Sequence, residues 1–193
     1  MSAADPAHVL IAGGGIAGVE AVLALRDLAG DRVEITVVDP AELFVVRATS
    51  TASAVGGPPV DSRPLDDVVA AAGAALVPGR LAAVDADRRV AMLEGGDLLT
   101  YDHLIVAAGA HPEPHLRGAL TFAGPADGRA FRAMLDRAAG HGGRGQAPRL
   151  VIVVPPGTPW PLVAYELALL SASYLDGRGA RDALDISIVT SED

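Results

Sequence analysis

The sequence of 193 residues contains no cysteine and no lysine. Without cysteine it forms no disulfide, no thiolate metal site and no redox-active thiol pair. Without lysine it forms neither a Schiff base nor the phosphate-binding lysine of a Walker motif. All 15 cationic side chains are therefore arginine. These absences exclude thiol, imine and Walker-type chemistry before any motif is considered.

Long apolar runs and export signals are also missing. No run approaches the ~20 apolar residues of a transmembrane helix, so no transmembrane segment is predicted. The start, MSAADPAHVL, has no basic segment followed by an apolar one. The cytoplasm is therefore the expected compartment, with peripheral membrane association of a longer form left open. A net charge of -9 argues against a nucleic-acid partner, and the five histidines lack metal-binding spacing, so no metal site is predicted.

The N-terminal part of the sequence has a strand, turn, helix, strand pattern. Residues 8–12 are a short apolar run that leads into a glycine-rich turn and an apolar-sided helix. Residues 33–40 form the next apolar run, which Pro40 ends. Continuous apolar strands that alternate with helices predict a parallel sheet in an α/β domain.

The glycine-rich turn has the spacing of a dinucleotide-binding loop. It consists of Gly13, Gly14, Gly15, Ile16, Ala17 and Gly18. In G-x-G-x-x-G the glycines allow a tight turn, close approach of the pyrophosphate, and close packing of helix on strand. Asp39 follows Gly18 by 21 residues, at the end of the second strand, where a carboxylate accepts ribose hydroxyls. Motif, flanking elements and acid together predict dinucleotide binding.

The rest of the chain continues the alternation of strands and helices. Residues 47–61 are expected to be irregular, and a helix is expected from 64 to 72, with Asp61 or Ser62 as its cap. Short strands are expected between turns at 85–89 and 94–97. Further predicted elements are a strand in 103–110, a helix at 127–139, a glycine-rich linker at 140–145, a strand at 150–154, a helix after it, and a strand at 186–190.

The turn after the strand at 150–154 reads PPGTPWP, residues 155–161. It stands where a second phosphate-binding loop would begin, yet four of its seven residues are prolines. Proline has no backbone N–H, and a phosphate cradle is built from backbone N–H groups. The turn therefore argues against tight NAD(P)H binding, and whether it binds any other ligand stays open.

Beyond the glycine motif, the sequence resembles a family of flavoproteins. "ITVVDPAELF" is followed by "TYDHLIVAAGA", where Tyr101 and Asp102 precede a strand that leads to Ala107, Ala108 and Gly109. This order resembles the pyridine nucleotide-disulfide oxidoreductase family, including type II NADH dehydrogenases and sulfide:quinone reductases. Ala108 replaces the family's usual threonine. The resemblance implies FAD as the cofactor, and it covers the N-terminal half of such an enzyme.

The resemblance also implies further cofactor contacts and a division into domains. Asp39 with Pro40, the backbone of 107–109, and Arg80 with Leu81 beside the adenine would contact FAD. Arg47 is either a contact to the phosphates or ring edge, or a solvated loop arginine. The implied ranges are 1–123 for the first part of a Rossmann-like FAD-binding domain, 124–148 for a connecting helix and linker, and 149–193 for an incomplete second Rossmann-like unit.

Two functions follow from these observations. The first is an FAD-dependent oxidoreductase that exchanges electrons with small-molecule donors and acceptors. The second is a non-catalytic module or subunit that binds FAD or another adenine dinucleotide. A single-domain NAD-dependent dehydrogenase is a weaker third, because no Tyr-Lys or His-Asp pair offers a general base. No catalytic residue is identified, and both a homodimer and a completing partner chain stay open.

Overall fold

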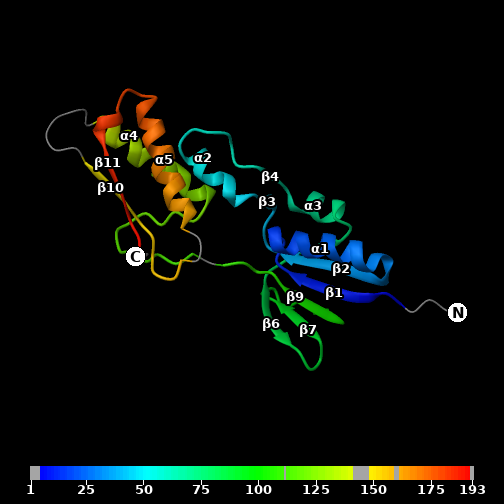
Figure 1. The fold of residues 1–193 in the computed structure, drawn as a ribbon. Helices are drawn as coiled ribbons and strands as arrows, with labels where there is room; N and C mark the ends of the chain where they lie inside the picture. The colour runs from blue at the N-terminus through cyan, green and yellow to red at the C-terminus, as the bar shows by residue number, and fades with distance from the viewer. Residues whose placement is uncertain (1–4, 111, 141–147, 159–160, 192–193) are drawn as a thin grey trace. The chain divides into compact units, whose positions relative to one another are not determined.

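The computed structural model describes residues 5–110, 112–140, 148–158 and 161–191 (Figure 1). Packing divides the chain into two compact units. Unit 1 comprises Met1–Val45 and Ser62–His111, and unit 2 comprises Val46–Asp61 and Pro112–Asp193. These units do not coincide with the ranges 1–123, 124–148 and 149–193, which stay a prediction. The glycine-rich linker at 140–145 lies outside the described residues, except for Gly140.

Unit 1 is built on a parallel four-stranded sheet in the order β5-β2-β1-β9. The strands are β1 (Ala7–Ala12), β2 (Val33–Asp39), β5 (Ala75–Pro78) and β9 (His103–Val106). On one face, helices α1 (Ile16–Ala29) and α3 (Leu65–Ala71) pack through Val22, Leu65 and Val69 against Val9 and Ile11. The α/β fold expected from the apolar strand pattern is therefore confirmed.

The second face of this sheet is covered by a small antiparallel sheet in the order β6-β7-β8. Its strands are β6 (Leu81–Asp85), β7 (Val90–Leu93) and β8 (Leu98–Thr100), and the turns between them lie where the sequence predicted. Leu10 and Val38 pack against Ala91 and Leu93. Because successive side chains of a strand alternate between faces, the continuous apolar run of β1 fills a core on each side.

Asp102 fastens β9 to β1 at the start of both strands. Its Oδ2 atom accepts a hydrogen bond of 2.8 Å from the His8 N–H, and its own N–H donates to the His8 carbonyl at 2.9 Å. The carboxylate also faces Arg89, 3.7 Å away. This reciprocal bonding gives a structural reason for the Asp in the Tyr-Asp pair that precedes the strand.

The segment 46–61 leaves unit 1 and packs into unit 2. Strands β3 (Leu43–Val45) and β4 (Ser62–Pro64) pair antiparallel at the two ends of this excursion. Between them lie a 3-10 turn at Arg47–Thr49 and helix α2 (Ser50–Ala54), so the expectation of an irregular 47–61 was wrong for 47–54 and is confirmed for 55–61. The expected caps were also wrong, because Pro64 is the N-cap of α3 and no side chain caps that helix.

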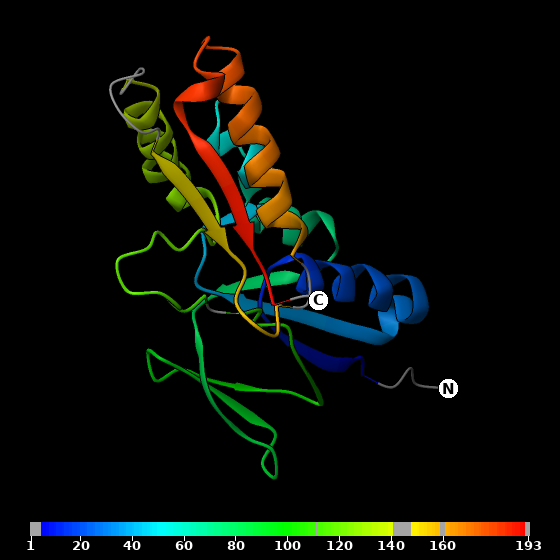
Figure 2. The same ribbon diagram turned by 60° about the vertical axis from the view of Figure 1, so that its left-hand side comes forward.

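Unit 2 contains two parallel strands packed against helices. Figure 2 shows β10 (Arg149–Val153) beside β11 (Asp185–Val189), with α4 (Gly128–Gly140) and α5 (Leu162–Asp176) behind them. Leu150 packs with Phe131 and Leu135 of α4 and with Leu167 of α5. Unit 2 also has 3-10 turns at Pro125–Asp127 and Arg181–Ala183, and unit 1 has one at Gly30–Arg32. The start of a second strand-helix-strand unit was predicted and is present.

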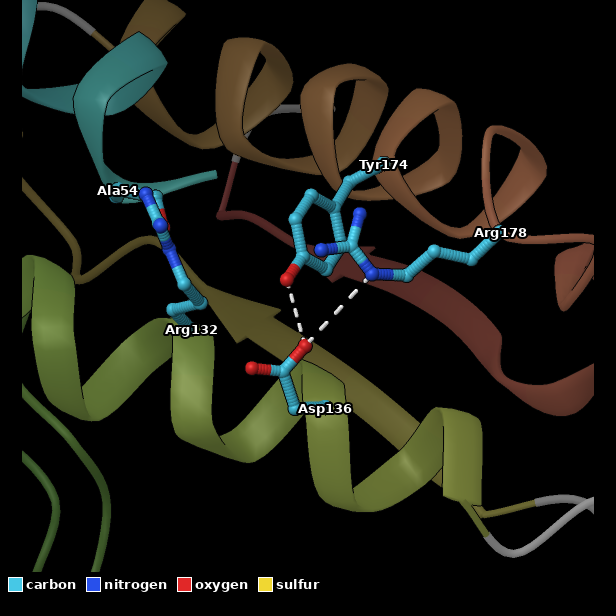
Figure 3. Close-up of polar contacts among 5 residues, drawn as sticks. All are labelled: Ala54, Arg132, Asp136, Tyr174 and Arg178. Carbon is cyan, nitrogen blue, oxygen red and sulfur yellow. Dashed lines mark hydrogen bonds and ion pairs between the residues drawn. The ribbon is translucent and has the colours of Figure 1, made fainter. Parts of the chain in front are cut away.

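Polar side chains on α4 and α5 fasten the three helices of unit 2 to one another (Figure 3). The Arg132 guanidinium donates to the carbonyl oxygens of Ser53 and Ala54, at 2.6 and 3.1 Å. Both carbonyls belong to the last turn of α2, where a cation is favourable for the helix dipole. This contact holds the segment 46–61 on unit 2.

Tyr174 joins α5 to α4. Its hydroxyl donates to the Asp136 carboxylate at 2.6 Å, and the Arg178 guanidinium lies 3.7 Å from the centre of the Tyr174 ring (Figure 3). Burial, together with the hydrogen bond and the negative charge of Asp136, raises the pKa of the Tyr174 phenol above its usual 10.0. The phenol therefore stays neutral and serves as a donor between two helices.

Candidate dinucleotide-binding site

Gly13 is the residue at which the chain leaves β1. It has a φ of 118°, which side chains other than glycine rarely adopt. A Cβ atom here would lie 2.2 Å from the Ala107 carbonyl oxygen. The Gly13 N–H donates to the Val38 carbonyl at 2.8 Å, which closes the turn over the end of β2. The fold itself therefore requires glycine at this position.

Gly18 and Gly14 are also restricted by neighbouring protein atoms. A Cβ on Gly18 would lie 1.8 Å from the Gly13 carbonyl oxygen, because α1 packs tightly on the turn. A Cβ on Gly14 would lie 2.9 Å from the side chain of Leu65. The contact at Gly18 matches the helix-packing role that the motif assigns to its last glycine, whereas Gly14 occupies a variable position of the motif.

Gly15 differs from these three glycines. It is the N-cap of α1 with a φ of -73°, which any residue adopts. A Cβ built on Gly15 meets no protein atom within 4 Å. Gly15, Ile16 and Ala17 are all exposed at the start of the helix. No packing contact in the described protein requires a glycine at this position, although glycine is a favoured N-cap; close approach of a ligand would also favour it.

The start of α1 offers backbone donors to an anion. The first N–H groups of a helix have no partner within it, and here no side chain caps them. The first turn also contains no acidic residue that would compete with an anion. The helix dipole adds partial positive charge at the same place. The surroundings of Gly15 thus suit a phosphate group.

Asp39 lies directly against the turn. Its Oδ2 atom accepts from the Gly14 N–H at 2.7 Å, and its Oδ1 atom accepts from the Ala41 N–H at 2.8 Å. A carboxylate has about four acceptor positions, so about two remain for a ligand such as a ribose diol. Sequence reasoning predicted the ribose role, and the structure adds that Asp39 holds the glycine turn. Pro40, next in the chain, is exposed.

The predicted segment after β9 also reaches the turn. The Ala107 N–H donates to the Ala12 carbonyl at 2.7 Å, so Ala107 extends the ladder of β1 beside Gly13. The strand was expected in 103–110 but ends at Val106. Ala108 and Gly109 are exposed, and Gly109 has a φ of 72°. Asp39, through its side chain, and Ala107, through its backbone, therefore both lie against the glycine turn.

Among the residues that the structure describes, the others predicted to contact the cofactor form no hydrogen bond with the glycine turn. The Gly79 N–H donates to the Asp39 carbonyl at 3.2 Å, which brings the backbone before Arg80 to the end of β2. The Arg80 side chain is exposed and pairs with Glu94 at 3.4 Å, while Leu81 packs against the core between the two sheets. Arg47 lies in unit 2 and is exposed. The roles of Arg80, Leu81 and Arg47 toward a cofactor stay predictions.

The proline-rich turn of unit 2 offers few donors in its described part. Pro155 and Pro156 have no N–H. The Thr158 N–H and hydroxyl both donate to the Pro155 carbonyl, at 3.3 and 2.7 Å. Helix α5 then begins at Leu162 with Pro161 as its N-cap and no side-chain cap. The bonding inside this turn agrees with the expectation that it makes a poor phosphate cradle.

Two features of the described residues bear on other kinds of site. In 5–110, 112–140, 148–158 and 161–191, no three His, Asp or Glu side chains gather as metal ligands. Over the same residues, no helix is both long and apolar enough to cross a membrane.

Sequence reasoning missed the Asp136–Tyr174 contact. Its only sequence signal was the spacing of Tyr174 and Arg178 by one helical turn, because Asp136 lies on another helix.

Comparisons with known proteins agree with this geometry. The family description "Pyridine nucleotide-disulphide oxidoreductase" matches residues 7–153. No curated protein matches the chain. Among solved structures, the sulfide:quinone oxidoreductase of Aquifex aeolicus has a TM-score of 0.83 at 22% identity. The match covers 96% of this chain and 43% of the Aquifex chain. NDH2 of Plasmodium falciparum, solved with NADH, has a TM-score of 0.69 at 15% identity, over 94% and 41%.

A third similar structure is putidaredoxin reductase in its covalent complex with putidaredoxin, with a TM-score of 0.66 at 21% identity. The match covers 94% of this chain and 49% of the other chain. The chain thus spans less than half the length of each of these three proteins. At these identities the likeness establishes the fold, and the predicted Rossmann-like FAD-domain architecture is confirmed.

Proposed function

Because the chain belongs to the pyridine nucleotide-disulphide oxidoreductase family, we propose that unit 1 binds FAD at the glycine turn and that the protein takes part in flavin-dependent electron transfer. One observation carries the binding proposal. No packing contact within the described protein requires glycine at position 15, since a Cβ there meets no atom within 4 Å. A bound pyrophosphate in that space accounts for it.

The residues around the turn define how FAD would be held. The N–H groups at the start of α1 bind the pyrophosphate, and the two free acceptor positions of Asp39 bind the ribose hydroxyls. Arg80 and Leu81 would border the adenine, and the backbone of 107–109 would pack against the FAD. When bound, FAD supplies the ability to accept and release a pair of electrons.

The electron donor and acceptor are small molecules in this proposal. One structural neighbour is named a sulfide:quinone oxidoreductase and another was solved with NADH, so both substrate classes are candidates for this chain. The proline-rich turn of unit 2 favours a donor other than NAD(P)H. The same turn favours a second candidate function, a non-catalytic FAD-binding module or subunit that a partner chain completes.

The test is reconstitution of the purified chain with FAD. We expect the visible absorption of bound flavin and a measurable heat on titration with FAD, with weaker binding of NADH. A chain that gives neither flavin absorption nor heat contradicts the proposal. Reduction of a quinone or dye by the reconstituted chain, with sulfide or NAD(P)H as donor, then separates the oxidoreductase from the non-catalytic module.

A further inference from the structure

Gly14, the second glycine of the turn, is required neither by the motif nor by its own backbone. It occupies a variable position of G-x-G-x-x-G, and it lacks the positive φ of Gly13. The space around it excludes a side chain instead. A Cβ on Gly14 would lie 2.9 and 3.0 Å from the two Cδ atoms of Leu65, and 3.2 Å from the Asp39 Cβ. Leu65 is therefore the main reason for glycine at position 14.

Leu65 is held in place and cannot easily make room for a larger residue. It is the first residue of α3 and only 1% exposed, within the core between α1, α3 and the sheet. Its N–H donates to the Glu42 carbonyl at 2.9 Å, and Pro64 before it pairs with Leu43. In a close-packed core the neighbours restrict a buried side chain to few positions. The two methyl groups of Leu65 thus form a fixed surface beside Gly14.

Leu65 also contacts both segments that hold the Asp39 carboxylate. Its side chain lies against Gly14, whose N–H donates to the Asp39 Oδ2 atom at 2.7 Å. Its backbone bonds to Glu42, next to Ala41, whose N–H donates to the Asp39 Oδ1 atom at 2.8 Å. Hydrogen bonds are directional, so a shift of either donor would turn the carboxylate. Leu65 thus lies where it fixes both donors to Asp39.

We propose that Leu65 is a positioning residue for dinucleotide binding. By holding Gly14 and the loop 39–42, it keeps the unused acceptor positions of the Asp39 carboxylate directed at the ribose. Leu65 touches no ligand itself and acts through Asp39. The inference rests on the proposed function, since it concerns the same FAD site. It adds to that site a residue of α3, outside the glycine motif and its helix.

Core packing alone is the alternative role for Leu65, and Val69 offers the matched control. Val69 lies one turn further along α3, is 0% exposed and belongs to the same core. The atoms nearest to a Cβ on Gly14 belong to Leu65 and Asp39, so Val69 shares the core but not this contact. If Leu65 were purely structural, substitutions at the two positions would have the same kind of effect.

The first test compares Leu65→Ala with Val69→Ala by urea denaturation without FAD, and by calorimetric titration with FAD at a temperature where both are folded. Both variants lose buried aliphatic groups, so both should unfold at lower urea concentrations than wild type. Leu65→Ala should also weaken FAD binding by about tenfold or more, because hydrogen bonds to a charged acceptor are misaligned. Val69→Ala should keep the wild-type Kd. Leu65→Met, which conserves volume, should keep it too.

The second test needs no FAD. Gly14→Ala should lower stability in the wild-type background, because its methyl group meets the Cδ atoms of Leu65. In a Leu65→Ala background the same methyl group enters the vacated space, so its cost should be much smaller. In a Val69→Ala background the cost should stay as in wild type. Should Leu65→Ala not fold, the shorter Leu65→Val replaces it in both tests.

The outcomes separate this proposal from the proposed function. A wild type that binds no FAD contradicts the proposed function, and the positioning role falls with it. A wild type that binds FAD, with Leu65→Ala and Val69→Ala of equal affinity, contradicts the positioning role alone. Additive costs of Gly14→Ala and Leu65→Ala show that the two residues do not interact, which also overturns the proposal.

Discussion

At the scale of single residues, the glycines of the turn have different causes. Gly13 is fixed by its positive φ and by the Ala107 carbonyl, and Gly18 by the Gly13 carbonyl. Gly15 meets no protein atom. The same residue type thus serves close packing of the protein on itself at Gly13 and Gly18, and the proposed close approach of FAD at Gly15. Substitutions should separate these needs.

Alanine substitutions at positions 15 and 18 add the same methyl group with opposite expected results. Gly15→Ala should cost at most about 1 kcal/mol of stability, through the poorer N-cap, and weaken FAD binding by about tenfold or more. Gly18→Ala should destabilise the protein by about 3 kcal/mol or more, because its methyl group meets a backbone oxygen. Urea denaturation without FAD and calorimetric titration with FAD measure the two effects. Full FAD affinity in Gly15→Ala would contradict the site.

Asp39 is expected to act on both the turn and the ribose. Asp39→Ala leaves the N–H groups of Gly14 and Ala41 without their acceptor, which should cost about 1–3 kcal/mol of stability without ligand. It should also weaken FAD binding by a similar amount. Thermal melting with and without FAD separates these effects, and Asp87→Ala, at an exposed turn residue, is the control. If Asp39→Ala melts lower but binds FAD normally, the carboxylate serves only the turn.

At the scale of elements, the packing of α5 on α4 includes one buried phenol. The apolar contacts of Phe131, Leu135 and Leu167 bury side chains without fixing how one helix lies on the other. The hydrogen bond from Tyr174 to Asp136 is directional and is formed only in one arrangement. Arg132 adds a similar restraint on α2 through two backbone carbonyls. These contacts define the position of each helix within unit 2.

Tyr174→Phe should lower stability near neutral pH by about 1 kcal/mol, since it removes a hydrogen bond to a half-exposed carboxylate. The raised pKa of Tyr174 also gives a pH dependence. The fold favours the neutral phenol, so its contribution is complete below the unfolded-state pKa of 10.0 and is lost as pH rises through the higher folded-state pKa.

Urea denaturation at increasing pH checks this expectation. Wild type should lose stability above about pH 10 more steeply than Tyr174→Phe does. Tyr165→Phe is the control, because Tyr165 lies on the same helix and is 38% exposed. Equal stability and equal pH dependence of wild type and Tyr174→Phe would show that the hydroxyl contributes nothing to the packing of α5 on α4.

At the scale of the whole molecule, the two compact units should respond differently to FAD. At a concentration about 100 times its Kd, FAD should stabilise the unit that binds it by about 2.7 kcal/mol. Hydrogen exchange followed by mass spectrometry should therefore show slower exchange in β1, the start of α1 and the end of β2. Protection of unit 2 without unit 1 would contradict the site.

The local pattern of the sequence predicted most helices and strands and a dinucleotide-binding turn. The periods of the apolar residues predicted β1, α1, β2, β10 and α5, and the glycine spacing with Asp39 predicted a dinucleotide turn. These features are local, because a helix or a buried strand is specified by neighbouring residues and the glycine motif lies within six residues. The errors came where contacts with residues distant in sequence decide the local structure. An example is the short α2, whose last carbonyls accept hydrogen bonds from Arg132 in a distant part of the chain.

Tertiary structure alone decided which residues meet. It brought Asp39 to the Gly14 N–H, Ala107 to Gly13, and Asp102 to His8, across separations that no local pattern encodes. It assigned segment 46–61 to unit 2. The physical reason is that backbone pairing and close packing depend on partners far along the chain. The sequence therefore predicted a dinucleotide-binding turn, and only the fold showed which of its glycines the packing of the protein itself requires.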